Sequence, residues 1–328
     1  MTNDEVIAFL GPSWDKTMEI IRGALQSDIR LLNDVNGTLL SHSGKMLRPM
    51  LGLLCASACM PEHPLPEDSS RFAAASELLH NASLLHDDVV DGSSERRGLP
   101  TVRSVLGGPA SVLIGDFWLV KAIEVVLGSS RFCETAIRIF AKTLSDLSEG
   151  EMLQLEKSGS GDTTEADYAR IIYSKTASLF EAAAVTGALS AGASQVWTDG
   201  IRRYAVALGM AVQIRDDMMD YGDGGDIGKP VGADLREQKI TLPLLGALST
   251  LSPEDAVEVR QRVCQLGEHP EFELGIRRLV AEKDGLGYAR KRMERYIAEA
   301  VEALGVLPES PARSYLQQIA LYVGVREV

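Results

Sequence analysis

The chain has 328 residues, a formal net charge of −13 and a pI near 4.9. This acidic balance excludes nucleic acid as the main partner, because a phosphate backbone requires a basic protein face. The first thirty residues show no basic segment followed by an apolar one, and no stretch approaches 18 uninterrupted apolar residues. We therefore expect a cytoplasmic protein without a transmembrane segment.

Helical periodicity runs through nearly the whole chain, and no segment is typical of a β-strand. Aromatic residues make up 5% of the chain, whereas strong helix formers such as Ala, Leu and Glu are abundant. Asp162 with Glu165 resembles a capping box, and Ser252 followed by Pro253 marks another helix start. We expect helices over residues 4–33, 45–60, 69–91, 110–127, 131–157, 164–189, 194–221, 239–249, 253–266, 279–304 and 309–323.

The loops between these segments are too short to separate two domains. The sequence therefore predicts a single all-α domain over residues 1–328, arranged as a large helical bundle. Residues 112–127 and 178–193 carry too few charges for a fully solvated outer face. Such helices lie in a large core or in an oligomer interface, which makes a homodimer the expected assembly. Cys55 and Cys59 share a helical face and are expected in the core, since the four cysteines show no C-x-x-C spacing.

Two acidic clusters of the form D-D-x-x-D, residues 87–91 and 216–220, each follow a long apolar stretch. On a helix the first and last aspartates of each cluster share a face. Three carboxylates near a helix C-terminus repel one another and oppose the helix dipole, so a fold would normally avoid them. Short carboxylates are the oxygen ligands that Mg²⁺ prefers. The sequence thus predicts a divalent-cation site with the ligands Asp87, Asp88, Asp91, Asp216, Asp217 and Asp220.

Basic residues accompany both clusters. Mg²⁺ usually binds through one or two carboxylates together with substrate phosphates, and Arg and Lys hold the remaining phosphate oxygens. This combination indicates a metal-bridged polyphosphate substrate. The candidate cations are Lys45, Arg48, Arg96, Arg97, Lys229 and Lys239.

The sequence disfavours two other kinds of site. Glu77 and His80 form an E-x-x-H, which di-iron bundles use twice, but it occurs here once. His80 lies almost on the face of Asp87 and is predicted to contact substrate, whereas His86 receives no role. The segment ending in Gly228 and Lys229 lacks the residues and the preceding strand of a P-loop, which excludes that mode of nucleotide binding.

The ordered set of motifs resembles the trans-polyprenyl diphosphate synthases, the family that elongates isoprenoid chains. The match extends over more than half the chain, and one departure is Gln238, where the family usually has glycine. The motifs are Gly44–Pro49, Leu84–Asp91 with Arg96–Gly98, Gly150–Gln154, Lys175–Ala177, Gln213–Asp220, Gly228–Leu235 and Lys239–Pro243.

The resemblance implies an isoprenoid synthase type I fold around a central apolar cavity, with the two acid clusters facing each other across its mouth. It implies about three Mg²⁺ ions, with Mn²⁺ as a substitute, and two substrates, an allylic diphosphate and isopentenyl diphosphate. Asp87, Asp91 and Asp216 would bind metal directly, and the other three aspartates would close the site or bind through water. Arg96, Lys175 and Lys239 would hold the allylic diphosphate. Lys45, Arg48, His80 and Arg97 would hold isopentenyl diphosphate, and Thr176 and Gln213 would lie beside the reacting carbons.

Product length is expected to depend on the helix that carries the first cluster. Ala82 and Ser83 lie roughly 6–8 Å below Asp87 on that helix at about 1.5 Å per residue. These are small residues, and Leu79 one turn further is a partial obstruction, so we expect a long product of about six to ten isoprene units, as in a quinone side chain. Release of such a product could bring the protein into transient contact with a membrane.

Alternative interpretations are a farnesyl or geranylgeranyl diphosphate synthase, a class I terpene cyclase and a non-catalytic prenyl-binding subunit. A cyclase typically has an N-D-x-x-S-x-x-x-E motif in place of the second cluster, and a non-catalytic subunit is expected to have lost one cluster. Both clusters are intact here.

Overall fold

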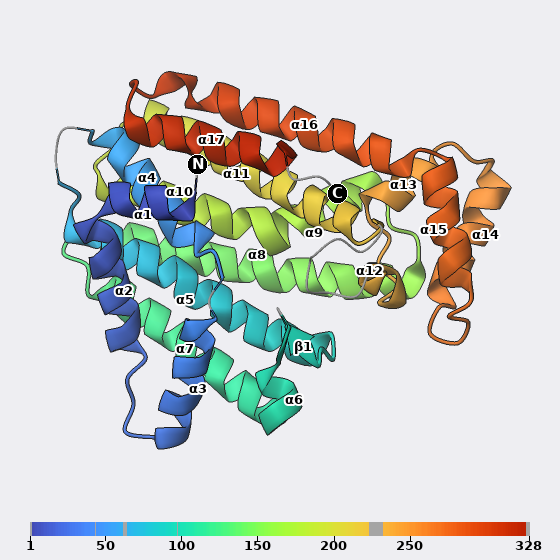
Figure 1. Cartoon of the computed structure of the whole chain (residues 1–328), viewed down its shortest axis with the longest axis horizontal. Helices are drawn as coiled ribbons and strands as arrows, with labels where there is room; N and C mark the ends of the chain where they lie inside the picture. The colour runs from blue at the N-terminus through green and yellow to red at the C-terminus, as the bar shows by residue number, and fades with distance from the viewer. Residues whose placement is uncertain (1, 43, 62–63, 97, 223–231, 326–328) are drawn as a thin grey trace. The chain divides into compact units, whose positions relative to one another are not determined.

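The computed structural model describes residues 2–42, 44–61, 64–96, 98–222 and 232–325. Over these residues the chain forms helices joined by short connections, together with a hairpin of two very short strands (Figure 1). The predicted all-α fold class is confirmed. Two predicted substrate ligands, Arg97 and Lys229, lie outside the described residues.

The helices gather into two compact units, each built from segments that are distant in the sequence. The first unit comprises residues 1–144, 179–205 and 301–319, and the second comprises residues 145–178, 206–300 and 320–328. The prediction of one domain over residues 1–328 and that of a central cavity stay predictions. Five of the described helices contribute residues to both units: α8 (Cys133–Ser160), α10 (Ser178–Ser190), α11 (Gln195–Met219), α16 (Gly285–Ala303) and α17 (Pro311–Val325).

The first unit is organised around α5, which packs against α2, α4 and α7. The segment of α5 from Phe72 to Leu79 is buried throughout. A Cβ at Gly187 of α10 (Ser178–Ser190) would lie 2.1 Å from the carbonyl oxygen of Gly52, so α4 and α10 cross backbone to backbone. The other elements of this unit are α1 (Asn3–Leu10), α2 (Pro12–Ala24), α3 (Arg30–Ser41), α4 (Leu47–Cys59), α5 (Glu67–Val90), β1 (Glu95–Arg96), β2 (Leu99–Pro100), α6 (Val102–Leu106), α7 (Gly108–Leu127) and η2 (Leu304–Val306).

The long N-terminal helix predicted over residues 4–33 is wrong. Helix α1 ends at Gly11, whose φ of +47° a residue with a side chain rarely adopts, and Pro12 begins α2 as its first residue. A separate helix, α3, then runs from Arg30 to Ser41. Asn36 anchors α3, because it donates to the carbonyl of Leu25 at 2.9 Å and accepts from the indole of Trp118 on α7 at 2.8 Å.

The second unit contains a segment of π-helix, η1, between α9 and α10, which the sequence did not predict. The capping box of α9 begins at Thr164 and includes Asp167, two residues later than predicted, because Asp162 instead bonds to Lys157 and Ser160. The predicted N-cap at Ser252 is confirmed. The remaining elements are α9 (Glu165–Ile172), η1 (Tyr173–Ala177), α12 (Ala233–Arg236), α13 (Leu242–Leu248), α14 (Pro253–Cys264) and α15 (Phe272–Glu282).

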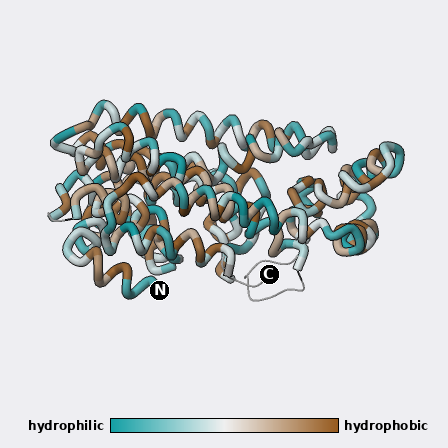
Figure 2. Tube along the Cα trace, turned by 90° about the horizontal axis from the view of Figure 1, so that it is seen from above, coloured by the Kyte–Doolittle hydropathy of each residue, from teal (hydrophilic) through white to brown (hydrophobic). Residues whose placement is uncertain are grey.

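Figure 2 shows hydrophobic and hydrophilic residues alternating along much of the helical trace, as expected of helices with one buried face. Among the described residues, no helix is both long and apolar enough to cross a membrane. The apolar helix α10 is largely buried in the first unit. On α7, by contrast, the side chains of Leu113, Val120 and Leu127 are 68%, 50% and 59% exposed, respectively.

Candidate functional site

The first acid cluster forms the C-terminal end of α5. Asp88 is buried, and its Oδ1 accepts hydrogen bonds from Nε and Nη2 of Arg96 at 2.9 and 2.8 Å. Asp87 and Asp91 are half-buried, and the amide of Asp91 donates to the carbonyl of Asp87 at 2.8 Å as the helix ends. Arg96 is held near Asp88 by the β1–β2 hairpin, in which it pairs with Leu99. The hairpin corrects the expectation that no strand is present.

His86 precedes this cluster and packs against α7. Its Nε2 lies 3.2 Å from Oδ1 of Asp116 and 3.4 Å from the carbonyl of Val112. A Cβ at Gly115 would lie 2.4 Å from the same nitrogen, so the absent side chain leaves the space that the imidazole fills. Gly115 therefore sets how closely α7 approaches the start of the acid cluster.

The predicted ligands of isopentenyl diphosphate lie near the start of α4 and on α5. Lys45 is exposed, and the guanidinium of Arg48 stacks over the ring of Phe180 at 4.8 Å from its centroid. Such a cation–π contact restricts the guanidinium without removing its charge. His80 is half-buried on α5.

The predicted chain-length residues lie on the same helix. Leu79 and Ala82 are buried, each with 2% of its surface exposed, and Ser83 is half-buried. The hydroxyl of Ser83 donates to the carbonyl of His80 at 2.9 Å, so it is satisfied within its own helix. The role of these residues in product length stays a prediction.

The second acid cluster forms the C-terminal end of α11, and its three aspartates have different surroundings. Asp216 is exposed and accepts from Nη2 of Arg215 at 2.8 Å. Asp217 is buried and accepts from the hydroxyl of Tyr168 at 2.6 Å and from Nε2 of Gln213 at 2.7 Å. Asp220 accepts from the backbone amides of residues 233 and 234 at 3.0 and 3.1 Å.

Burial raises the pKa of Asp217 well above its ordinary value, and the nearby charge of Asp234 raises it further. The hydrogen bonds from Tyr168 and Gln213 oppose this shift because they stabilise the carboxylate. Burial and the charge of Asp217 also raise the pKa of Tyr168, which keeps its hydroxyl protonated as a donor.

The π-helical segment η1 places Lys175 and Thr176 between α8 and α11. A Cβ at Gly150 of α8 would lie 2.5 Å from Cβ of Ser174, and one at Gly209 of α11 would lie 2.5 Å from Cα of Ala177. Both glycines therefore allow the wider π-turn to fit. Single π-turns inserted in α-helices are frequent at functional sites.

Two predicted diphosphate ligands of this unit form ion pairs with glutamates. Lys175 pairs with Glu151, and Lys239 pairs with Glu237. The hydroxyl of Thr176 donates to Oε1 of Gln213 at 2.5 Å, so the two residues predicted beside the reacting carbons are in contact. Glu151 was not predicted as a site residue, although it belongs to a recognised motif.

Gln238, the departure from the family pattern, adopts a φ of +59°, a conformation that favours glycine. Nε2 of its side chain donates to the carbonyl of Cys264 at 2.9 Å, which offsets part of the backbone strain. The turn before Lys239 therefore forms without the usual glycine.

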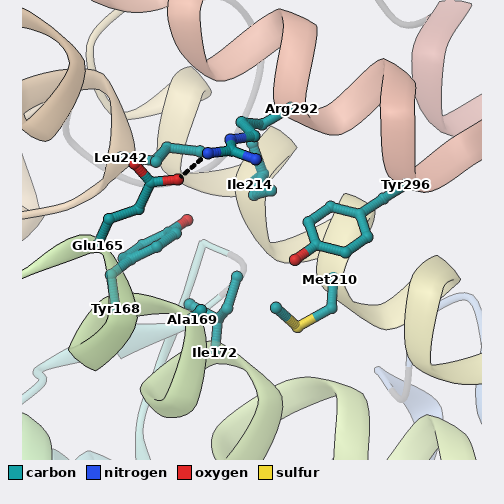
Figure 3. A pocket seen from close by; sticks show the side chains of 9 residues that line it. All are labelled: Glu165, Tyr168, Ala169, Ile172, Met210, Ile214, Leu242, Arg292 and Tyr296. Carbon is teal, nitrogen blue, oxygen red and sulfur yellow. Dashed lines mark ion pairs between the residues drawn. The ribbon is translucent and has the colours of Figure 1, made fainter.

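A small cavity of about 40 Å³ lies beside Tyr168 in the second unit. Figure 3 shows Tyr168 on α9 and, across the cavity, Arg292 and Tyr296 on α16. Arg292 forms an ion pair with Glu165 at 2.6 Å, and the hydroxyl of Tyr288 also donates to Glu165 at 2.6 Å. These contacts join α16 to the first turn of α9.

Among the described residues, no group of three or more His, Cys, Asp or Glu side chains is arranged to hold a metal ion. Each cluster does offer outer carboxylates four residues apart on one helix, Asp87 with Asp91 and Asp216 with Asp220. Mg²⁺ commonly uses one or two carboxylates and takes its other oxygens from phosphates and water. The donor chemistry of both clusters therefore fits Mg²⁺ bound together with a diphosphate.

The sequence model of the polyprenyl synthetase family matches residues 29–271. The chain is 40% identical over 299 residues to the octaprenyl diphosphate synthase of Escherichia coli (strain K12), which covers 90% of each protein. It resembles the crystal structure of a decaprenyl diphosphate synthase from Rhodobacter capsulatus with a TM-score of 0.91 at 33% identity, covering 99% of this chain and 100% of that one. It also resembles a polyprenyl synthase from Caulobacter crescentus CB15 complexed with calcium and isoprenyl diphosphate, with a TM-score of 0.90 at 33% identity, covering 100% of this chain and 98% of that one.

The helical fold and the two D-D-x-x-D helix ends define the class of protein, a trans-prenyltransferase. The chain belongs to the polyprenyl synthetase family, as the length of the family match and the 40% identity establish. The predicted family, fold class and kind of enzyme are confirmed.

Proposed function

We propose that this protein condenses an allylic diphosphate with isopentenyl diphosphate to give a long-chain all-trans polyprenyl diphosphate, with Mg²⁺ as cofactor. The observation that carries the proposal is the shared arrangement of the two acid clusters. In each cluster the second aspartate is buried and held by hydrogen bonds, whereas the first and third are more exposed. This supports direct metal binding by the outer carboxylates of Asp87, Asp91 and Asp216, and a supporting role for Asp88 and Asp217.

The reaction begins when the allylic C–O bond breaks and its electron pair leaves with the diphosphate. Mg²⁺, when bound, neutralises the negative charge that develops on the departing oxygens. Lys175 and Lys239 hold the same diphosphate and add positive charge, which lowers the barrier as the leaving group departs. Arg96 stays the third predicted ligand of this diphosphate.

The second substrate then attacks the allylic cation through its double bond, and a proton is lost to the released diphosphate. Lys45, Arg48 and His80 hold the diphosphate of this isopentenyl substrate. The stacking of Arg48 on Phe180 supports this role, because a guanidinium of restricted orientation loses less entropy when it binds phosphate. Water must be excluded so that the cation is not quenched.

The proposed product is long, as in the octaprenyl and decaprenyl synthases that the chain resembles. The small side chains of Ala82 and Ser83 support this proposal, because neither is bulky enough to block a product chain that runs along α5. A farnesyl or geranylgeranyl product is the alternative.

We further propose that the protein acts in the cytoplasm as a homodimer and contacts a membrane transiently when it releases product. The exposed apolar side chains of Leu113, Val120 and Leu127 support the dimer, since their seven-residue spacing forms one stripe along α7. Val120→Glu together with Leu113→Glu should shift the protein to the monomer in light-scattering measurements. An unchanged mass would refute an interface at α7.

The function is tested by incubating the protein with isopentenyl diphosphate and allylic primers of different length. We expect prenyl products in the presence of Mg²⁺ and none with EDTA. Asp87→Ala and Asp216→Ala should each lower kcat by about a hundredfold or more, whereas Asp34→Ala, at an exposed helical position, should not. A cyclic hydrocarbon product would indicate a terpene cyclase, and absence of any product would indicate a binding subunit.

A further inference from the structure

Four side chains of the second unit form a continuous series of hydrogen bonds. Tyr168 donates to one oxygen of Asp217 at 2.6 Å, and Gln213 donates to the other at 2.7 Å. Thr176 donates to the amide oxygen of Gln213 at 2.5 Å. This hydrogen-bonded chain thus runs from a buried tyrosine on α9 to a threonine in the π-turn.

The chemistry of each group fixes the direction of the next hydrogen bond. A carboxylate accepts and does not donate, so it selects the NH₂ side of the Gln213 amide. The amide oxygen then faces Thr176, and because this oxygen has no proton, the threonine hydroxyl must donate its own. The lone pairs of the Thr176 oxygen are consequently directed away from Gln213.

Tyr168 is well suited to hold Asp217, the acceptor of its hydrogen bond, in place. It is 4% exposed, and it lies on α9 one residue after Asp167, the third helical residue, which forms a capping box with the N-cap residue Thr164. Its ring borders the cavity of Figure 3 together with Ile172, Met210 and Ile214. The phenol hydroxyl is directed at Asp217, from whose Oδ2 it lies 2.6 Å away.

We propose that Tyr168 is a positioning residue for prenyl transfer, which orients the hydroxyl of Thr176 through Asp217 and Gln213. The inference rests on the proposed function, in which Thr176 and Gln213 lie beside the reacting carbons. An oxygen whose proton is committed to Gln213 presents its lone pairs to the allylic cation and stabilises the charge as it develops. Without Tyr168, Asp217 and the Gln213 amide can rotate, and the hydroxyl loses its fixed orientation.

The test is Tyr168→Phe, which removes one hydroxyl and keeps the ring. Tyr204→Phe is the matched control, because Tyr204 is also fully buried and donates to a neutral acceptor, the carbonyl of Leu316, at 2.8 Å. Both variants should lower Tm, Tyr168→Phe by more because its acceptor is a buried carboxylate. Tyr168→Phe should lower kcat about tenfold with both KM values unchanged, as expected when a residue that orients active groups is lost, and Tyr204→Phe should leave kcat within about twofold of wild type.

A double-mutant cycle separates positioning from general destabilisation. In a Thr176→Val background, where the hydroxyl is absent, Tyr168→Phe should lower kcat by less than about twofold further, because the two variants act through the same group. If the effects of the two substitutions multiply, or if the two Tyr→Phe variants have equal kcat values, Tyr168 is not a positioning residue. Neither result would contradict the proposed function. A wild-type protein that forms no prenyl product would refute the proposed function, and this inference with it.

Discussion

Gly209 lies on α11 where that helix meets the π-turn, and Gly209→Ala tests how far the site depends on this close approach. The new Cβ would lie 2.5 Å from Cα and 2.8 Å from Cβ of Ala177. Ordinary contacts begin at 3.4 Å, so α11 and the π-turn have to separate by roughly 0.9 Å (3.4 minus 2.5).

The free energy of unfolding should fall. Overpacking costs about 1–3 kcal/mol, and the upper end applies because the closest atom of Ala177 belongs to the backbone and cannot rotate away. Alanine recovers about 1 kcal/mol of helix propensity relative to glycine. The net loss is about 2 kcal/mol, which corresponds to a decrease in Tm of about 3 °C for a chain of this length.

Activity should fall more steeply than stability. A displacement near 1 Å moves Lys175 and Thr176, and misplacement of this size reduces turnover by about a hundredfold. The control is Gly275→Ala on α15, where a Cβ meets nothing within 4 Å; its Tm should stay equal or rise and its kcat should not change. Calorimetry and steady-state kinetics give both quantities. If Gly209→Ala has the Tm and kcat of wild type, the contact between α11 and the π-turn does not position the site.

Three further predictions concern other parts of the chain. Ser83→Phe should shift the dominant product to about the farnesyl or geranylgeranyl length in chromatography, and an unchanged distribution would mean that the product does not pass this side of α5. Gly115→Ala should displace His86 from α7 and lower kcat, whereas Gly275→Ala again serves as the unaffected control; normal turnover would show that the packing of His86 is dispensable. Burial raises the pKa of Cys59 to about 12 and that of Cys55 well above its ordinary value, so both thiols should resist alkylation at pH 8 until the protein unfolds, and rapid labelling of more than two cysteines in native protein would contradict this. Because these thiols ionise more readily in the unfolded chain, stability should fall as the pH rises above the ordinary thiol pKa.

The sequence by itself predicted the structural features that depend on residues near one another along the chain. Helical periodicity predicted the all-α class, and the position of each D-D-x-x-D after a long apolar stretch placed the two acid clusters at helix ends. The four-residue spacing put the first and last aspartates of each cluster on one face, because four residues make about one helical turn. The start of α14 at Ser252 followed from its local capping residues. The break of the N-terminal helix at Gly11 and Pro12 also had a local signal, which the continuous periodicity concealed.

Tertiary structure decided how the members of each cluster differ. Asp88 is buried because the β1–β2 hairpin brings Arg96 to it, and Asp217 is buried beside a tyrosine 49 residues earlier in the chain. The π-turn likewise forms where Gly150 and Gly209 let two other helices approach it, and the sequence of the turn carries no sign of this. Such contacts join segments that are distant in sequence, and their formation depends on packing and desolvation in the folded protein, which local periodicity does not encode.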